Sequence, residues 1–344
     1  MRRGLWPGLL LVPLLCLALA GCATTSTEKP PELTVNIPAD LLPDRPGASV
    51  KRVDADSDGK LEWLVFYRFD QVGGGGPVAA IIYDVAANAG QLPVLYPYKL
   101  RTPDQSYLAQ QVPDWAMLDI MPEPGGVGRK ELVLSTANDL VIFQANGNVV
   151  NQPLDDPPLY RCIGFFRSDG GVMLDPESRR VTVTRLAYER SQLVKRDYYA
   201  PVADGYFVTG TTTLVSPLES AVGFPGEVPS GILDTPYPEK IVMAFYKTLG
   251  NPELKPTILE YLTTRASNEM AAGRLQYGSP YALDQINYAV VKEIGYLATQ
   301  EDTPSTVVTV DVVFVSKSGA RSPLKEISWQ LVRQESRWKM DFAQ

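Results

Sequence analysis

The stretch that decides the fold of the N-terminal half is Asp54-Ala-Asp-Ser-Asp-Gly-Lys-Leu-Glu-Trp-Leu-Val-Phe-Tyr67. Its first half alternates carboxylates with small residues and reaches a glycine, Gly59, which is typical of a tight loop. Its second half is apolar, β-branched and aromatic, which favours a strand over Leu61–Tyr67. The stretch therefore predicts an acidic loop that leads directly into a β-strand.

The acidic loop has the composition of a calcium site. Calcium takes six to eight oxygen ligands, and a short loop with alternating carboxylates can supply most of them. A helix-flanked calcium loop would place a glutamate at position 12, but here that position is Val65, inside the expected strand. A solvated acidic turn without a cation is the alternative. The candidate ligands are the carboxylates of Asp54, Asp56, Asp58 and Glu62 and the backbone carbonyl of Lys60.

A weak internal repeat extends the pattern along the chain. The segment Gly59–Val65 aligns with Gly128–Leu134, but the alternating carboxylates do not precede the second copy. The loop that enters a strand resembles the repeats of the integrin-type FG-GAP and VCBS families, which are blades of β-propellers. This resemblance covers about twenty residues and implies a propeller-like domain with one intact calcium loop.

The region 45–216 is expected to be all-β, as an irregular propeller-like domain or a sandwich. It contains short alternating or β-branched runs split by Gly, Asn, Asp and Pro turns. At about 40–45 residues per blade, the region from Leu41 to Thr235 would hold four or five blades. The candidate strands are Leu61–Tyr67, Val78–Asp84, Glu131–Ser135, Leu140–Gln144, Arg180–Leu186, Gln192–Tyr199 and Tyr206–Leu214.

A Pro- and Gly-rich linker is expected over 217–235, followed by an α+β domain over 236–344. The domain opens with a helix over Pro236–Gly250, whose apolar residues recur at helical spacing. Two further helical candidates are Pro252–Leu262 and Ser279–Tyr288. The expected strands are Val290–Ala298, Thr306–Ser316, Lys325–Arg333 and Arg337–Phe342.

This order, with the opening run Pro238–Leu249 and the closing run Trp329–Asp341, is similar to the nuclear-transport-factor-2-like, or ketosteroid-isomerase-like, cone. That family includes isomerases with an acid/base pair inside the cone and many non-catalytic pocket domains. The candidates for such a pair are Asp311, Tyr261, Tyr288 and Glu293. None of them matches a catalytic motif position. We therefore expect the tyrosines to lie at the edge of the core and the acids to face solvent.

The N-terminus predicts export and lipid attachment. An apolar run over Leu9–Ala20 follows Arg2 and Arg3 and is too short to span a bilayer, which fits a secretory signal. Its end, Leu19-Ala20-Gly21-Cys22, resembles the bacterial lipobox, whose cysteine becomes the acylated N-terminus. We therefore expect a signal peptide (1–21), a lipidated Cys22 with a flexible tether (22–44), and an extracytoplasmic protein anchored to a membrane of the cell envelope. An ordinary signal peptide with an incidental cysteine is the alternative.

The cysteine count agrees with this interpretation. Cys16 leaves with the signal and Cys22 carries lipid, so Cys162 alone remains and no intramolecular disulfide can form. No histidine or basic cluster adjoins Cys162, so we expect it to be a small buried apolar residue.

The composition restricts the function further. The 344 residues are 45% hydrophobic and 21% charged, which fits a folded chain of two or three domains. Histidine is absent, which removes the usual general base and the commonest zinc ligand. The net charge of −7 disfavours nucleic acid as a partner. The expected function is a non-catalytic binding module for an unidentified protein, peptide or glycan; the alternative is an envelope enzyme with carboxylate or tyrosine acid–base chemistry in the C-terminal cone.

Overall fold

The computed structural model describes residues 49–68, 77–86, 94–103, 107–121, 130–145, 160–188, 190–202, 205–206, 216–249, 251, 255–296 and 304–343. The expected signal peptide, Cys22 and the tether lie outside these ranges, as does most of the expected strand Tyr206–Leu214. Within these ranges, no helix combines the length and the apolar character that crossing a membrane requires.

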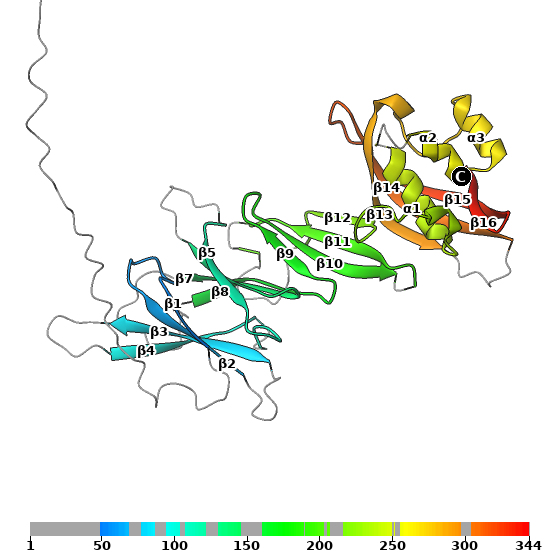
Figure 1. The fold of residues 1–344 in the computed structure, drawn as a ribbon. Helices are drawn as coiled ribbons and strands as arrows, with labels where there is room; N and C mark the ends of the chain where they lie inside the picture. The colour runs from blue at the N-terminus through cyan, green and yellow to red at the C-terminus, as the bar shows by residue number, and fades with distance from the viewer. Residues whose placement is uncertain are drawn as a thin grey trace, which may run out of the picture. The chain divides into compact units, whose positions relative to one another are not determined.

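The described N-terminal region is all-β, as expected, and consists of three antiparallel four-stranded sheets (Figure 1). In each sheet the strands pair with their neighbours in chain order. The first sheet contains β1 (Ser49–Val53), β2 (Glu62–Arg68), β3 (Val78–Ala86) and β4 (Val94–Leu100). The second contains β5 (Asp114–Leu118), β6 (Glu131–Ser135), β7 (Asp139–Ala145) and β8 (Tyr160–Arg167). The third contains β9 (Val172–Asp175), β10 (Arg180–Tyr188), β11 (Leu193–Tyr199) and β12 (Glu219–Gly223).

These three sheets replace the four or five blades that a repeat of about 40–45 residues predicts. Each described sheet uses more of the chain than such a repeat, because long connections separate some paired strands, as between β11 and β12. The segment 217–235 also differs from the expected linker. It contains β12 and the 3₁₀ turn η1 (Ile232–Asp234), and its apolar residues Val222 and Phe224 pack into the C-terminal core.

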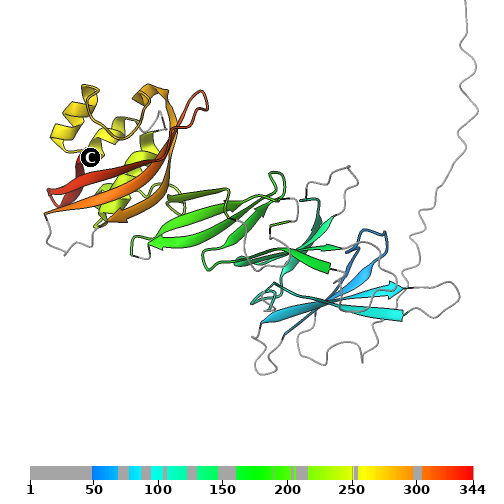
Figure 2. The same ribbon diagram turned by 180° about the vertical axis from the view of Figure 1, so that it is seen from behind.

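The C-terminal part has a fourth antiparallel sheet, and helix α1 (Pro238–Leu249) lies against one of its faces (Figure 2). The sheet contains β13 (Ile286–Tyr296), β14 (Ser305–Ser316), β15 (Lys325–Gln334) and β16 (Arg337–Ala343), in chain order. Between α1 and β13 lie α2 (Lys255–Ile258), the 3₁₀ turn η2 (Leu259–Tyr261), α3 (Thr264–Ala271) and the 3₁₀ turn η3 (Leu283–Gln285).

Two segments of this part differ from the sequence analysis. The helix expected over Ser279–Tyr288 is wrong: the segment has only the short turn η3 before Ile286 and Tyr288 pair with β14, because pairing and burial override local helix propensity. Helix α3, by contrast, was not expected. It begins after Thr263, whose side chain accepts a hydrogen bond from the amide of Ala266 and so caps the helix.

Apolar alternation along β14 builds the C-terminal core. Val308, Val310, Val312 and Phe314 are fully buried and face α1, while the intervening residues are only half-buried. Phe245 of α1 packs against Trp329 with ring centroids 5.3 Å apart, and the Trp329 indole donates a 2.9 Å hydrogen bond to the Tyr246 hydroxyl. Large aromatic side chains therefore fill the space between α1 and the sheet.

Candidate metal centre

The acidic loop joins β1 to β2, and buried residues hold both of its ends. Val53 ends β1, Ala55 lies in the apolar core, and Glu62 begins β2 with 1% of its surface exposed. The expected order of loop and strand is therefore present, and buried residues anchor both ends of the loop in the first sheet.

Two left-handed residues turn the loop. Ser57 has φ of 62° and Gly59 has φ of 86°, so the glycine lies where its conformational freedom is needed. The backbone amides inside the turn donate to the aspartates: Gly59 to Asp54 Oδ2 at 3.1 Å, and Asp58 to Asp56 Oδ1 at 3.0 Å. These bonds hold the carboxylates of Asp54 and Asp56 around the turn.

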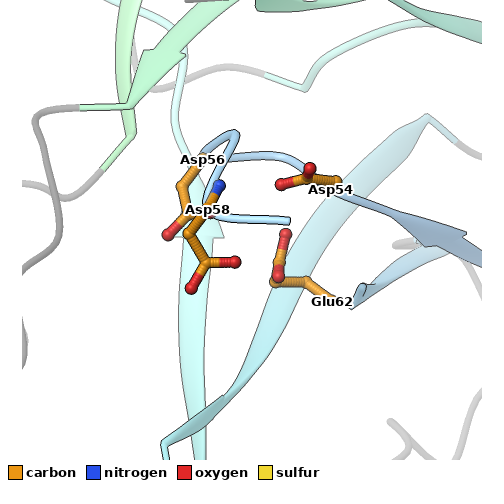
Figure 3. Close-up of side chains that lie close together, drawn as sticks. All are labelled: Asp54, Asp56, Asp58 and Glu62. Atoms are coloured by element: carbon orange, nitrogen blue, oxygen red, sulfur yellow. The ribbon is translucent and has the colours of Figure 1, made fainter. Parts of the chain in front are cut away.

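The structure brings the four predicted carboxylate ligands together (Figure 3). One oxygen from each of Asp54, Asp56, Asp58 and Glu62 lies within 4.8 Å of the others. The Oδ1 atom of Asp54 is buried and has no hydrogen-bond partner among the described residues. An orphaned buried carboxylate oxygen is costly, and a cation would satisfy it.

Glu62 is the most buried of these carboxylates. Its Oε2 accepts a 2.5 Å hydrogen bond from the amide of Ala55, which joins the two ends of the loop. Burial raises the pKa of Glu62 to about 8, and the nearby charges of Asp56, Asp84 and Asp54 add to the rise, while the Ala55 hydrogen bond opposes it. Burial likewise raises the pKa of Asp56, helped by the charges around it. Four carboxyl groups this close together repel one another when ionised, and a divalent cation would offset that repulsion.

Lys60, the fifth predicted ligand through its backbone carbonyl, has a second role in the loop. Its ammonium pairs with Asp58 Oδ2 at 2.9 Å, and its amide donates to Asp58 Oδ1 at 2.8 Å. Although burial acts in the opposite direction, these contacts lower the pKa of Asp58. The exposed lysine side chain thus supplies one positive charge at the outer side of the cluster.

The second copy of the repeat keeps the buried glutamate and has no carboxylate at the positions that align with Asp56 and Asp58. Glu131 begins β6 as Glu62 begins β2, it is fully buried, and its Oε2 accepts a 3.1 Å hydrogen bond from the amide of Ile120. Asp119 instead lies 3.6 Å from a guanidinium nitrogen of Arg179. The alignment of the two copies could have identified this structural role of Glu131, because Glu131 aligns with Glu62.

The candidate acid–base residues of the C-terminal part fall into two groups. Tyr261, which is buried, and Tyr288, which is 43% exposed, both line a groove of about 1240 Å³ beside α1 and β13. Asp311 lies on the face of β14 opposite the core, directly across from Glu293 on β13. Neither Asp311 nor Glu293 is among the described residues that line the groove.

Two further residues differ from or extend the sequence expectations. Cys162 is half-buried rather than fully buried, and its thiol donates to the carbonyl of Gly164. Glu239 in the first turn of α1 is fully buried, and neither carboxylate oxygen has a hydrogen-bond partner among the described residues.

Comparison with models of known protein families finds no match, and comparison with curated proteins finds none either.

Proposed function

We propose that this chain is a lipid-anchored, calcium-binding interaction module of the bacterial cell envelope. In this proposal Cys22 carries the lipid, the β1–β2 loop binds calcium, and the C-terminal part is a nuclear-transport-factor-2-like cone that binds a protein, peptide or glycan partner. The observation that carries the proposal is the convergence of four carboxylates on one tight loop.

The donor set supports calcium as the ion. All four side-chain ligands are carboxylates, which suit a hard cation, and the described cluster contains no nitrogen or sulfur ligand. Calcium tolerates irregular geometry and a ligand number of six to eight, whereas magnesium requires near-ideal octahedral geometry. A short loop with Asp54 and Glu62 at its two ends fits the more tolerant ion better.

Calcium titration of thermal unfolding tests this site. We expect millimolar calcium to raise the Tm of the full-length protein in detergent, because a ligand that binds only the folded state stabilises it by mass action. Asp56→Asn keeps the side-chain size and should abolish the rise, whereas Asp114→Asn, at an exposed position on β5, should keep it. An equal Tm for the wild type in excess chelator and in calcium would reject the site.

Fatty-acid labelling tests the anchor. The support is the lipobox-like Leu19–Cys22 directly after a short apolar run. Cys22→Ser should lose the label and stop signal cleavage, while Cys16→Ser, within the expected signal, should be labelled normally. A Cys22→Ser protein that is still processed and membrane-bound would contradict the lipid anchor.

Binding rather than catalysis is proposed for the C-terminal part because of how its candidate residues are distributed. Phe245, Tyr246, Phe314 and Trp329 pack together in the core between α1 and the sheet. The groove beside β13 is instead open to the surface at Tyr288 and contains neither of the candidate carboxylates, Asp311 and Glu293, among its described lining residues. The groove is lined by apolar residues together with charged ones of both signs, which suits a docked peptide or glycan. The charged residues are Arg196, Glu227, Asp234, Lys247, Glu260 and Arg337.

A further inference from the structure

The candidate calcium loop lies where the first sheet meets the second. Val53 and Ala55, on either side of Asp54, are each 1% exposed. They belong to a core to which both sheets contribute, and its members from the second sheet include Leu132, Leu134, Val141 and Phe143. The loop therefore rests directly on apolar side chains that the two sheets share.

A hydrogen bond also connects the turn itself to the second sheet. The amide of Lys130, immediately before β6, donates to the hydroxyl of Ser57 at 3.4 Å. Ser57 lies between the candidate ligands Asp56 and Asp58 and has the left-handed conformation of the turn. A cation that orders the carboxylates of Asp56 and Asp58 would therefore also order the Ser57 hydroxyl, which contacts the second sheet.

Tyr160 brings a buried polar group of the second sheet to the same place. It begins β8, it is 4% exposed, and its hydroxyl has no hydrogen-bond partner among the described residues. Tyr160 packs in the same core as Val53 and Ala55, which flank the candidate ligand Asp54 in the chain. The Tyr160 hydroxyl and Oδ1 of Asp54 are therefore both buried polar atoms without a partner among the described residues, and a bound cation with its ligands could satisfy such atoms.

We propose that calcium in the β1–β2 loop locks the first sheet to the second. This inference rests on the proposed calcium site. Without the cation, four carboxyl groups whose oxygens lie within 4.8 Å of one another stand beside the shared core, and their mutual repulsion when ionised opposes its burial. The cation offsets that repulsion and orders the Ser57 turn, so its binding energy stabilises the packing of β5–β8 against β1–β4 as well as the loop.

Hydrogen exchange of the full-length protein in detergent, with calcium or with excess chelator, tests the lock. If exchange requires the two sheets to separate, it should slow about tenfold when calcium is at ten times its Kd. The slowing should include β6, β7 and β8 as well as β1 and β2, while β13–β16 should exchange at the same rate in both conditions.

Two variants separate the lock from the calcium site. Asp56→Asn should remove the protection from both sheets, and Ser57→Ala should keep protection in β1 and β2 while reducing it in β6. Calcium protection confined to β1 and β2 in the wild type would overturn the lock and leave the calcium site standing. Unchanged exchange in every sheet of the wild type would overturn both.

Discussion

Gly59 is the residue at which the acidic loop most needs freedom of the backbone. Its φ of 86° lies in the region that side chains with a Cβ disfavour, yet an added Cβ would meet no atom within 4 Å. Gly59→Ala should therefore cost only backbone strain, about 1 kcal/mol of unfolding free energy, and should weaken calcium binding. Urea unfolding in chelator and in calcium measures both effects.

Gly226→Ala is the matched control for this prediction. Gly226 also has open space around its added Cβ, but its φ is not in the left-handed region. The control should unfold within about 0.5 kcal/mol of the wild type. Equal unfolding midpoints for the two alanine variants would show that the turn at Gly59 is not under the constraint described.

At the scale of single residues, the cluster of four carboxylates could be predicted from the sequence because these residues are close together in the chain. Asp54 to Glu62 span one loop, so spacing alone could predict their convergence. Tyr160 and Glu239 could not be found in this way. Their importance comes from burial without a partner, and that depends on elements distant in sequence.

At the scale of elements, the sequence identified the central strands of the first three sheets and missed their edges. Six of the seven expected runs correspond to β2, β3, β6, β7, β10 and β11, each of which has a neighbour on both sides, and most of the seventh, Tyr206–Leu214, lies outside the described residues. The strands that were not expected, β1, β4, β5, β8, β9 and β12, all lie at sheet edges. Edge strands tolerate polar residues and proline, such as Pro97 in β4, so their sequences lose the apolar pattern.

The edge strand β12 carries an ion-pair network that joins it to the C-terminal sheet. Glu219 Oε1 lies 2.9 Å from the Lys292 ammonium of β13 and 3.3 Å from the Arg321 guanidinium, and Arg180 of β10 lies 3.9 Å from Oε2. Burial alone would raise the pKa of Glu219, but the contacts with Lys292 and Arg321 lower it. The charged form of this carboxylate is therefore the one that stabilises the fold.

Glu219→Gln should destabilise the protein by about 1 kcal/mol at neutral pH, since one carboxylate serves three partly exposed cations. Because the folded-state pKa is lowered, the stabilisation is present above the ordinary glutamate range and is lost as pH falls through the lowered value. The difference in Tm between variant and wild type should shrink at low pH and in high salt. Glu177→Gln, in an exposed turn, is the control, and a difference independent of salt would argue against the network.

At the scale of the whole molecule, contacts between distant segments decide which parts of the chain act together. Val222 and Phe224, within the expected linker, pack into the C-terminal core, and Glu219 pairs with β13. Composition predicted a boundary there because Pro and Gly are common in linkers, but the same residues also suit the turns around a short edge strand. The order of sheets and helices was predictable; the coupling between them was not.

Glu239 lies where helix α1 meets the third sheet. It stands in the first turn of α1, and its buried carboxylate is near Ser191, in the turn between β10 and β11, whose hydroxyl is also buried without a partner. Burial raises the pKa of Glu239, and the nearby Ser191, Arg190 and Lys240 offset the rise only in part. Ionisation of this group therefore opposes the contact between α1 and the third sheet.

The consequence is a stability that depends on pH through Glu239. A carboxyl group with a raised pKa stabilises the fold fully below its ordinary, unfolded value, and this contribution is lost as pH rises through the raised value. Glu239→Gln has no such proton to lose. In saturating calcium, its Tm should therefore rise relative to the wild type as pH increases from 4 to 9. Glu177→Gln should follow the wild type throughout, because its carboxylate is exposed. A Glu239→Gln curve parallel to the wild type across this range would mean that the buried carboxylate keeps its charge at no cost to the fold.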